Sequence, residues 1–323
     1  MKTQDTTLLA IAVVVVWSSL GAQAQFWRPP AEGERCPSKW GADDQRGSGN
    51  HMKPETVLRA VKLIRTGEVF ELGQVLGPGM ALYGAPGARR FDLVMKRTTY
   101  TPKGNNRGSN EELVTTELGQ VGTQFDGFAH QTLGNIAYNC FKVDEIATRT
   151  GFTKLGIENV GALVTRGVLI DIAALKGVSK LPDTYEITPQ DLQDALKKQG
   201  LTLQPGDAII INTGWGQLWG KENTRYARSS PGIGVAAGEW LAKQDPMLIG
   251  SDNATVGQVN PDDEISTNVA IHPMMLAVYG IHLLESLKLE DLVARRVHEF
   301  AFILQPLKIQ GATGSTVAPI AIR

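Results

Sequence analysis

The chain has 323 residues, 42% of them hydrophobic and 20% charged, which is typical of a globular protein and argues against disordered, collagen-like and coiled-coil classes. The 32 basic residues balance the 33 acidic ones, so we expect no nucleic-acid partner. Glycine is in excess at 35 residues, which predicts many tight turns and a site built from loops. The sequence after residue 25 has no linker-like break, which predicts one domain.

The first 24 residues have the pattern of a secretory signal peptide. Lys2 precedes an apolar stretch from Leu8 to Trp17, and the small-residue ending Ala22-Gln23-Ala24 suits signal peptidase. The apolar stretch is too short to span a bilayer. We therefore predict a signal peptide over 1–24 with cleavage after Ala24, a periplasmic or secreted domain over 25–323, and no membrane contact afterwards. An uncleaved anchor is the alternative.

Two cysteines, Cys36 and Cys140, belong to the mature chain. An oxidising compartment permits one disulfide between them, but the sequence equally allows two unrelated thiols. Neither cysteine lies in a CxxC or a Cys/His spacing. A structural cysteine-zinc site and a cysteine nucleophile therefore lack support.

The N-terminal half of the mature chain mixes predicted helix, strand and loop. Lys53-Pro54-Glu55 opens a helix, and Gly67 provides its stop. The segment 76–90 is rich in Gly, Pro and Ala and predicts a long loop, which in a compact domain is often functional. Gly122 breaks the last strand of this half. The predicted strands here are 68–72, 91–100 and 113–126.

The C-terminal half contains short, continuous apolar runs of the kind found in strands that are buried on both faces. The predicted strands are 168–172, 208–212, 247–250, 281–285 and 299–304. The predicted helices are 188–198, 235–243 and 288–296. The sequence has neither a GxGxxG nor a GxxxxGK[ST] loop, so dinucleotide and P-loop nucleotide chemistry are disfavoured.

Side chains that bind metals or move protons gather around Gly122. They are Gln120, Gln124, Asp126 and His130. Gln124 and Asp126 are two residues apart on an extended segment, so they face the same side and could chelate one ion. His130 follows closely enough to handle a proton on a metal-bound water. The alternative is that these groups only satisfy backbone atoms beside a glycine turn.

This segment resembles the signature His-x-Gly-Thr-His-x-Asp-x-Pro-x-His of the cyclase family of metal-dependent amide hydrolases, which includes bacterial kynurenine formamidase and isatin hydrolase. The matching residues are Gly122, Thr123, Asp126 and His130, and the departures are Gln120, Gln124 and Phe128. Other matching segments are spread over most of the mature chain. They are Trp40-Gly41-Ala42-Asp43-Asp44, Gly206-Asp207, Thr213-Gly214-Trp215, His272-Pro273, Gly280-Ile281, Glu285 and Gly311-Ala312-Thr313-Gly314-Ser315.

The resemblance implies a single α/β domain of the swivelling β/β/α type, present as a homodimer. By position, Asp126 would bind a divalent metal and His130 would be the catalytic acid/base. His272 and Glu285 match residues that build a second metal position in some members.

The two glutamines stand where the signature has metal-binding histidines. Gln120 and Gln124 offer neutral amide oxygens in place of imidazoles, which lowers zinc affinity and favours manganese, magnesium or calcium. We therefore expect a divalent metal cofactor, manganese or zinc, with Gln120 and Gln124 as weak ligands.

The expected function is hydrolysis of a small amide, cyclic imide or lactone by a metal-activated water. A G-x-S-x-G motif is missing from the sequence, so serine-hydrolase chemistry lacks support. Trp40 and Trp215 are candidates for an aromatic substrate pocket, with core packing as the alternative, and Asp252 follows a predicted strand end where site residues often lie. We expect His282 to be structural or on the surface, because its odd spacing from Glu285 puts the two on opposite strand faces.

A protein of another class remains as the second hypothesis. The loss of two imidazole ligands at Gln120 and Gln124 suggests a periplasmic small-molecule binding protein that descends from such hydrolases but is catalytically silent. Retention of Asp126 and His130 argues for the enzyme.

Overall fold

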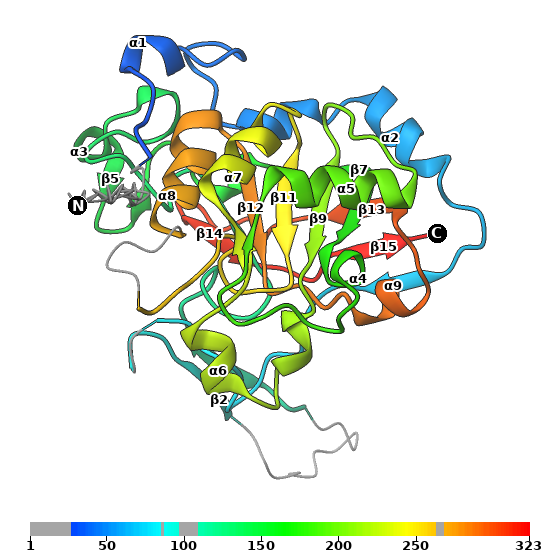
Figure 1. Ribbon diagram of the computed structural model, residues 1–323. Helices are drawn as coiled ribbons and strands as arrows, with labels where there is room; N and C mark the ends of the chain where they lie inside the picture. The colour runs from blue at the N-terminus through cyan, green and yellow to red at the C-terminus, as the bar shows by residue number, and fades with distance from the viewer. Residues whose placement is uncertain (1–26, 85–86, 97–108, 263–267) are drawn as a thin grey trace, which may run out of the picture.

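The computed structural model describes residues 27–84, 87–96, 109–262 and 268–323 (Figure 1). The expected signal peptide over 1–24 and its cleavage site lie outside these residues. Within the part of the chain that the structure describes, no helix is long and apolar enough to cross a membrane.

A nine-stranded mixed sheet forms the centre of the molecule, in the order β1-β15-β13-β7-β9-β11-β12-β4-β14. The four middle strands β7, β9, β11 and β12 are parallel, and the flanking pairs are antiparallel. The strand bounds are β1 Val69–Glu71, β4 Gln124–Asp126, β7 Leu163–Asp171, β9 Ala208–Asn212, β11 Leu248–Ser251, β12 His282–Glu285, β13 Glu299–Leu304, β14 Gly314–Thr316 and β15 Ile320–Ile322.

Three small two-stranded sheets accompany the large one. They are formed by β2 Phe91–Met95 with β3 Glu112–Thr116, β5 Ala147–Thr148 with β6 Gly151–Phe152, and β8 Glu186–Ile187 with β10 Gly232–Ile233.

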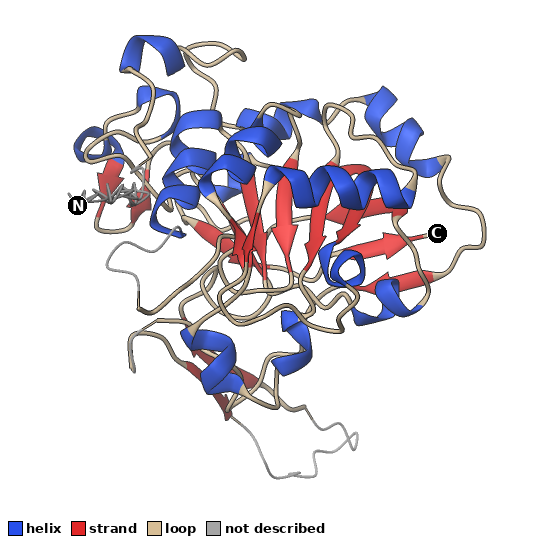
Figure 2. Ribbon diagram, viewed as in Figure 1, coloured by secondary structure: helices blue, strands red, loops and turns tan. Residues whose placement is uncertain are grey.

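The helices lie mostly around the large sheet, as Figure 2 shows. Their bounds are α1 Glu32–Arg35, α2 Pro54–Val61, α3 Val143–Ile146, α4 Ile172–Lys176, α5 Pro189–Gln199, α6 Asn223–Arg228, α7 Val235–Ala242, α8 Asn268–Pro273 and α9 Glu290–Ala294. Short 3-10 helices are η1 Gly47–His51, η2 Tyr138–Cys140, η3 Ile157–Asn159 and η4 Trp215–Leu218, and η5 Met274–Tyr279 is a π-helix.

The apolar side chains of the middle strands contribute to two cores, one on each face of the sheet. Val168 and Ile170 of β7 pack in the core that includes the inner side chains of α5 and α7. Leu169, between them, points to the opposite core, where Phe300 also lies. This alternation explains the continuous apolar runs in the sequence, because both faces of these strands are buried.

Helix α5 shows how local sequence sets the boundaries of an element. The Thr188 hydroxyl accepts a hydrogen bond from the Asp191 backbone N–H, and the Asp191 carboxylate accepts one from the Thr188 N–H, which completes a capping box. Gly200 ends the helix in the left-handed conformation at φ 69°.

The predicted strand over 113–126 is two strands with different partners. The N-terminal part, β3, pairs with β2, whereas β4 pairs with β12 and β14 in the large sheet. Gly119 and Gly122 have φ values of 101° and 64°, so the turn between the strands needs residues without a side chain. The sequence indicated the break but not the change of sheet.

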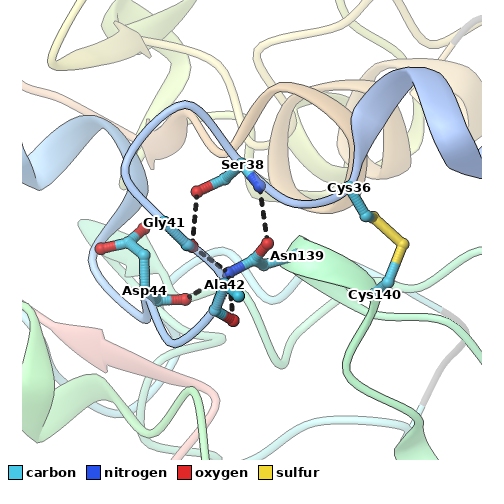
Figure 3. The surroundings of a disulfide bond; sticks show 7 residues. All are labelled: Cys36, Ser38, Gly41, Ala42, Asp44, Asn139 and Cys140. Atoms are coloured by element: carbon cyan, nitrogen blue, oxygen red, sulfur yellow. Dashed lines mark hydrogen bonds between the residues drawn. A yellow bond between two sulfur atoms is a disulfide. The ribbon is translucent and has the colours of Figure 1, made fainter.

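Cys36 and Cys140 form a disulfide with a Cα–Cα distance of 5.9 Å, the first of the two alternatives allowed by the sequence (Figure 3). Next to it, Asn139 accepts a hydrogen bond from the Ser38 N–H and donates to the carbonyls of Gly41, Ala42 and Asp44. These bonds attach the N-terminal segment to η2.

Candidate metal and catalytic site

Two neighbouring strands place three polar side chains on one face of the sheet. In the antiparallel pair β4–β12, Gln124 lies opposite Glu285, and Asp126 is two residues further along β4. Residues two apart on a strand share a face, so all three side chains point the same way. Phe125, between them, is fully buried in the core behind.

Two turns add the histidines. After β4, the Gly127 N–H donates to the Thr313 carbonyl, and the His130 N–H donates to the Gly127 carbonyl. A Cβ on Gly127 would lie 2.8 Å from the Thr313 oxygen, so only glycine permits this approach. His272 lies near the end of α8, directly before the π-helix that leads to β12. Short π-helical segments often occur at functional sites.

The Asp126 carboxylate lies at the centre of the cluster. Its Oδ2 is 3.6 Å from His272 Nε2 and 3.9 Å from His130 Nε2. One ligand atom from each of these three residues lies within 4.8 Å of the others. Asp126 Oδ2 is buried and has no hydrogen-bond partner among the described residues. A buried carboxylate oxygen facing two imidazoles suits a divalent cation.

Glu285 extends this cluster. Its Oε1 is 3.0 Å from His272 Nε2, and its Oε2 accepts a hydrogen bond from the Gln124 amide. Burial and the nearby Glu285 carboxylate raise the pKa of Asp126 well above its usual range. A bound cation would offset the burial of these charges and the repulsion between them, because it neutralises both carboxylates.

His130 is held as a neutral imidazole. Burial, with contributions from His272 and Arg89, lowers its pKa to about 3. Gln120 Nε2 lies 3.1 Å from His130 Nδ1 and 3.4 Å from Asp126 Oδ1. Arg89 Nη2 donates to Gln120 Oε1 at 3.1 Å. The arginine therefore orients the Gln120 amide, with its nitrogen directed toward the ring and the carboxylate.

Both predicted glutamines thus lie in the cluster. The hydrogen bonds described above use their amide nitrogens as donors, to the carboxylates and to His130. Their role as oxygen ligands stays a prediction.

A chamber of about 190 Å³ lies against the cluster. It is lined by Tyr83, Arg89, Gln120, Gln124, His130, Gln131, Ala254, Thr255, His272 and Glu285. Sequence reasoning missed Tyr83, Arg89, Gln131 and Thr255. Tyr83 and Arg89 belong to the glycine-rich loop 76–90, whose length was the only signal for a functional segment, and Thr255 follows the carboxyl end of β11.

The structure does not place Trp40, Trp215 or Asp252 among the residues that line the chamber. Trp40 packs edge-on against His51, with ring centroids 5.1 Å apart. Trp215 is fully buried and donates from Nε1 to the Tyr226 carbonyl. The core-packing alternative therefore describes Trp215.

The Asp252 carboxylate stabilises a turn through hydrogen bonds. It accepts hydrogen bonds from the Thr213 N–H and hydroxyl and from the Gly216 N–H. It therefore holds the segment after β9, while its neighbours Ala254 and Thr255 reach the chamber.

His282 has a structural role behind the site. It is fully buried and stacks on Phe128 with ring centroids 4.1 Å apart. Its Nδ1 lies 3.0 Å from the Asp126 backbone carbonyl, so the ring supports the strand that carries the central carboxylate. The prediction of a structural or surface role for His282 is therefore confirmed, and the role is structural.

Comparison with known proteins bears on both fold and family. A crystal structure described as a novel cyclase is 31% identical, with a TM-score of 0.79 over 88% of this chain and 98% of that one. Isatin hydrolase A from Ralstonia solanacearum is 20% identical, with a TM-score of 0.56 over 79% of this chain and 92% of that one. An isatin hydrolase bound to the product analogue thioisatinate is 18% identical, with a TM-score of 0.59 over 84% and 98%.

These structures confirm the predicted fold class, a single α/β domain of the cyclase type. No curated protein matches the chain significantly. The family model described as putative cyclase matches residues 70–258, which include both glutamines, Asp126 and His130. The chain belongs to the putative cyclase family.

Proposed function

We propose that this chain is a metal-dependent hydrolase that opens a small amide, cyclic imide or lactone. The observation that carries the proposal is Asp126, whose buried Oδ2 lacks a hydrogen-bond partner among the described residues and faces the imidazoles of His130 and His272. Structural neighbours described as isatin hydrolases support a hydrolase on this fold.

Asp126, His272 and Glu285 are the residues that would hold the ion. They supply two carboxylates and one imidazole, a donor set that fits manganese or zinc. A divalent ion bound there would polarise a carbonyl and lower the pKa of a bound water. The remaining steps fall to this chain's own side chains.

The hydrogen bonds around Gln120 support a particular tautomer of His130 in this proposal. Because Arg89 donates to Gln120 Oε1, the Gln120 N–H donates to His130 Nδ1. Nδ1 is then an acceptor, so a neutral ring carries its proton on Nε2, the nitrogen nearer to Asp126 Oδ2. His130 thus offers an N–H to the oxygen that gains charge when a carbonyl is attacked. In this proposal His130 therefore acts as a hydrogen-bond donor, which is a narrower role than the general acid/base role expected from the sequence.

Metal content tests the proposal directly. Purified mature protein should hold about one manganese or zinc ion per chain after loading, and Asp126→Ala should lose it, because the central carboxylate is gone. Elemental analysis measures the ratio, with the exposed Asp194→Ala as the matched control. Wild type without an ion under any loading would contradict the proposal.

His130→Ala separates chemistry from metal binding. This variant should keep its ion and its fold, while kcat against amides and lactones falls by a factor of roughly 10² or more, as when an oxyanion-stabilising donor is removed. Undiminished turnover would overturn the role of His130.

A catalytically silent binding protein is the second candidate, and the glutamines favour it. The amide nitrogens of Gln120 and Gln124 already bond the carboxylates where the family signature has metal-binding histidines. In that case the same elemental analysis finds no ion, and ligand screens find binding without turnover.

Location and assembly complete the proposal. We propose that the mature chain is periplasmic or secreted, as the first 24 residues predict, and that it is a homodimer. N-terminal sequencing of exported protein and its mass in solution test the two points.

A further inference from the structure

A second cavity lies beside the metal chamber and is much larger, at about 700 Å³ against 190 Å³. Tyr83 and Arg89 line both spaces, so these two side chains form the boundary between them. The chamber has room for a reacting carbonyl and its neighbours, while the larger cavity has the volume of a site for a whole small molecule. A substrate could thus have its scissile group in the chamber and its remainder in the large cavity.

Residues within 80–84 and 87–89 and residues of helix α6 and its C-terminal end form the described walls of this large cavity. Its described lining consists of Met80, Leu82, Tyr83, Gly84, Gly87, Arg89, Asn223, Thr224, Ala227 and Arg228. Two of these side chains are guanidinium groups, and none is acidic. Among the described residues, the walls are therefore apolar and neutral apart from two positive charges.

Neither arginine forms an ion pair with a residue that the structure describes, although the Asp126 and Glu117 carboxylates lie near enough to Arg89 to interact with it electrostatically. Arg89 donates to the neutral Gln120 amide and lies over the Tyr83 ring, 5.6 Å from its centroid. Arg228 is exposed, and its guanidinium makes no hydrogen bond or ion pair with any residue that the structure describes. By contrast Arg225, on the same helix, is paired with Asp183 at 2.6 Å and with Glu222 at 3.1 Å.

We propose that the large cavity binds a carboxylate group of the substrate through Arg228 and Arg89, so the substrate is an anionic amide, imide or lactone with an apolar body. A guanidinium presents paired N–H donors that match a carboxylate. Met80, Leu82 and the Tyr83 ring supply apolar and aromatic contact for the body. The inference rests on the proposed hydrolase and adds its substrate class.

Matched imides test the charge preference. Phthalimide and 4-carboxyphthalimide differ by one carboxylate, and both are opened when water adds across the imide C–N bond to give a carboxylate and a primary amide. Wild type should hydrolyse the carboxylated imide with the lower KM. Arg228→Gln should raise that KM by roughly 10- to 100-fold, the effect of one charged hydrogen bond, and leave the KM of phthalimide unchanged. Arg295→Gln, at an exposed remote arginine, is the control.

A binding arm makes failure of the inference distinguishable from failure of the function. Calorimetry compares benzoate with benzamide, its uncharged counterpart. Benzoate binding should weaken about tenfold or more in Arg228→Gln and should not change in Arg295→Gln. If neither imide is hydrolysed but benzoate binding depends on Arg228, the proposed hydrolase fails and the carboxylate site stands. If benzoate does not bind, or both imides react equally well with and without Arg228, the carboxylate site is overturned.

Discussion

Gln120 and Gln124 stand where the resembling family signature has histidines, and only the three-dimensional arrangement shows what their amides contact. An amide has a donor end and an acceptor end, whereas a neutral imidazole that binds a metal presents a lone pair. In this chain Arg89 fixes the acceptor end of Gln120, and the donor end then meets His130 Nδ1. In the proposed mechanism, the Gln120 amide therefore sets the tautomer of the neighbouring histidine, His130.

The tautomer of His130 is measurable by ¹⁵N NMR. In wild type, Nδ1 should give a pyridine-like shift and Nε2 a pyrrole-like shift, since the Gln120 N–H donates to Nδ1. Gln120→Glu should reverse the pattern, because a carboxylate accepts and does not donate. The His130→Ala spectrum assigns the signals. A protonated Nδ1 in wild type would contradict the assignment of His130 as a donor through Nε2.

At the scale of elements, the π-helix η5 connects the two halves of the site. It begins after Pro273, next to His272, and is capped by Gly280, two residues before β12. Gly280 has φ 60°, and a Cβ there would lie 2.2 Å from the Tyr138 ring. The same residue's carbonyl accepts a hydrogen bond from the Ser48 N–H. A single glycine thus lets η5, η1 and η2 approach one another.

Gly280→Ala should lower the free energy of unfolding by about 2–5 kcal/mol. A left-handed alanine costs about 1–2 kcal/mol, and overpacking against Tyr138 adds about 1–3 kcal/mol. Gly67 is a matched control, because it has φ 73° and nothing lies within 4 Å of its added Cβ. Gly67→Ala should therefore cost only the first amount. Equal losses in urea denaturation would mean that the Tyr138 contact relaxes freely.

Sequence reasoning predicted elements well where the pattern was local. The strands at 208–212 and 299–304 and the helix beginning at 188 are present, since apolar runs and capping residues mark them directly. It missed β14 and β15, which are three residues long and stabilised by partners far away in the chain. Pairing of β15 with β1 and β13 leaves no local trace.

The same limit applies to the site at the scale of the whole molecule. Asp126 and His130 are close in sequence and belong to a motif, and His272 and Glu285 were reached through the family resemblance. Arg89 belongs to no motif, and it meets Gln120 only because folding brings the residues directly before β2 next to the turn before β4. Trp215 fits a substrate pocket by residue type, yet the packing beside α6 buries it. The positions of Arg89 and Trp215 both depend on contacts between residues far apart in the chain, which the spacing of residues in the sequence does not reveal.

Packing of the whole molecule around His282 predicts an acid-sensitive fold. Burial lowers the pKa of His282 to about 4 from an ordinary value of 6.5. Between these values the unfolded chain binds a proton that the folded chain does not, so stability that is full above pH 6.5 is lost as the pH falls toward 4. At 1.36 kcal/mol per pKa unit, the loss from this residue is about 3 kcal/mol.

The variant His282→Gln isolates that contribution, because an amide can still donate to the Asp126 carbonyl but does not titrate. The difference in unfolding free energy between wild type and variant should therefore shrink by about 3 kcal/mol from pH 7 to pH 4, in favour of the variant at low pH. Urea denaturation at a series of pH values measures it, and other titrating groups such as His130 cancel in the difference. A difference that stays constant across this range would mean that His282 takes up its proton as easily in the folded protein as in the unfolded chain.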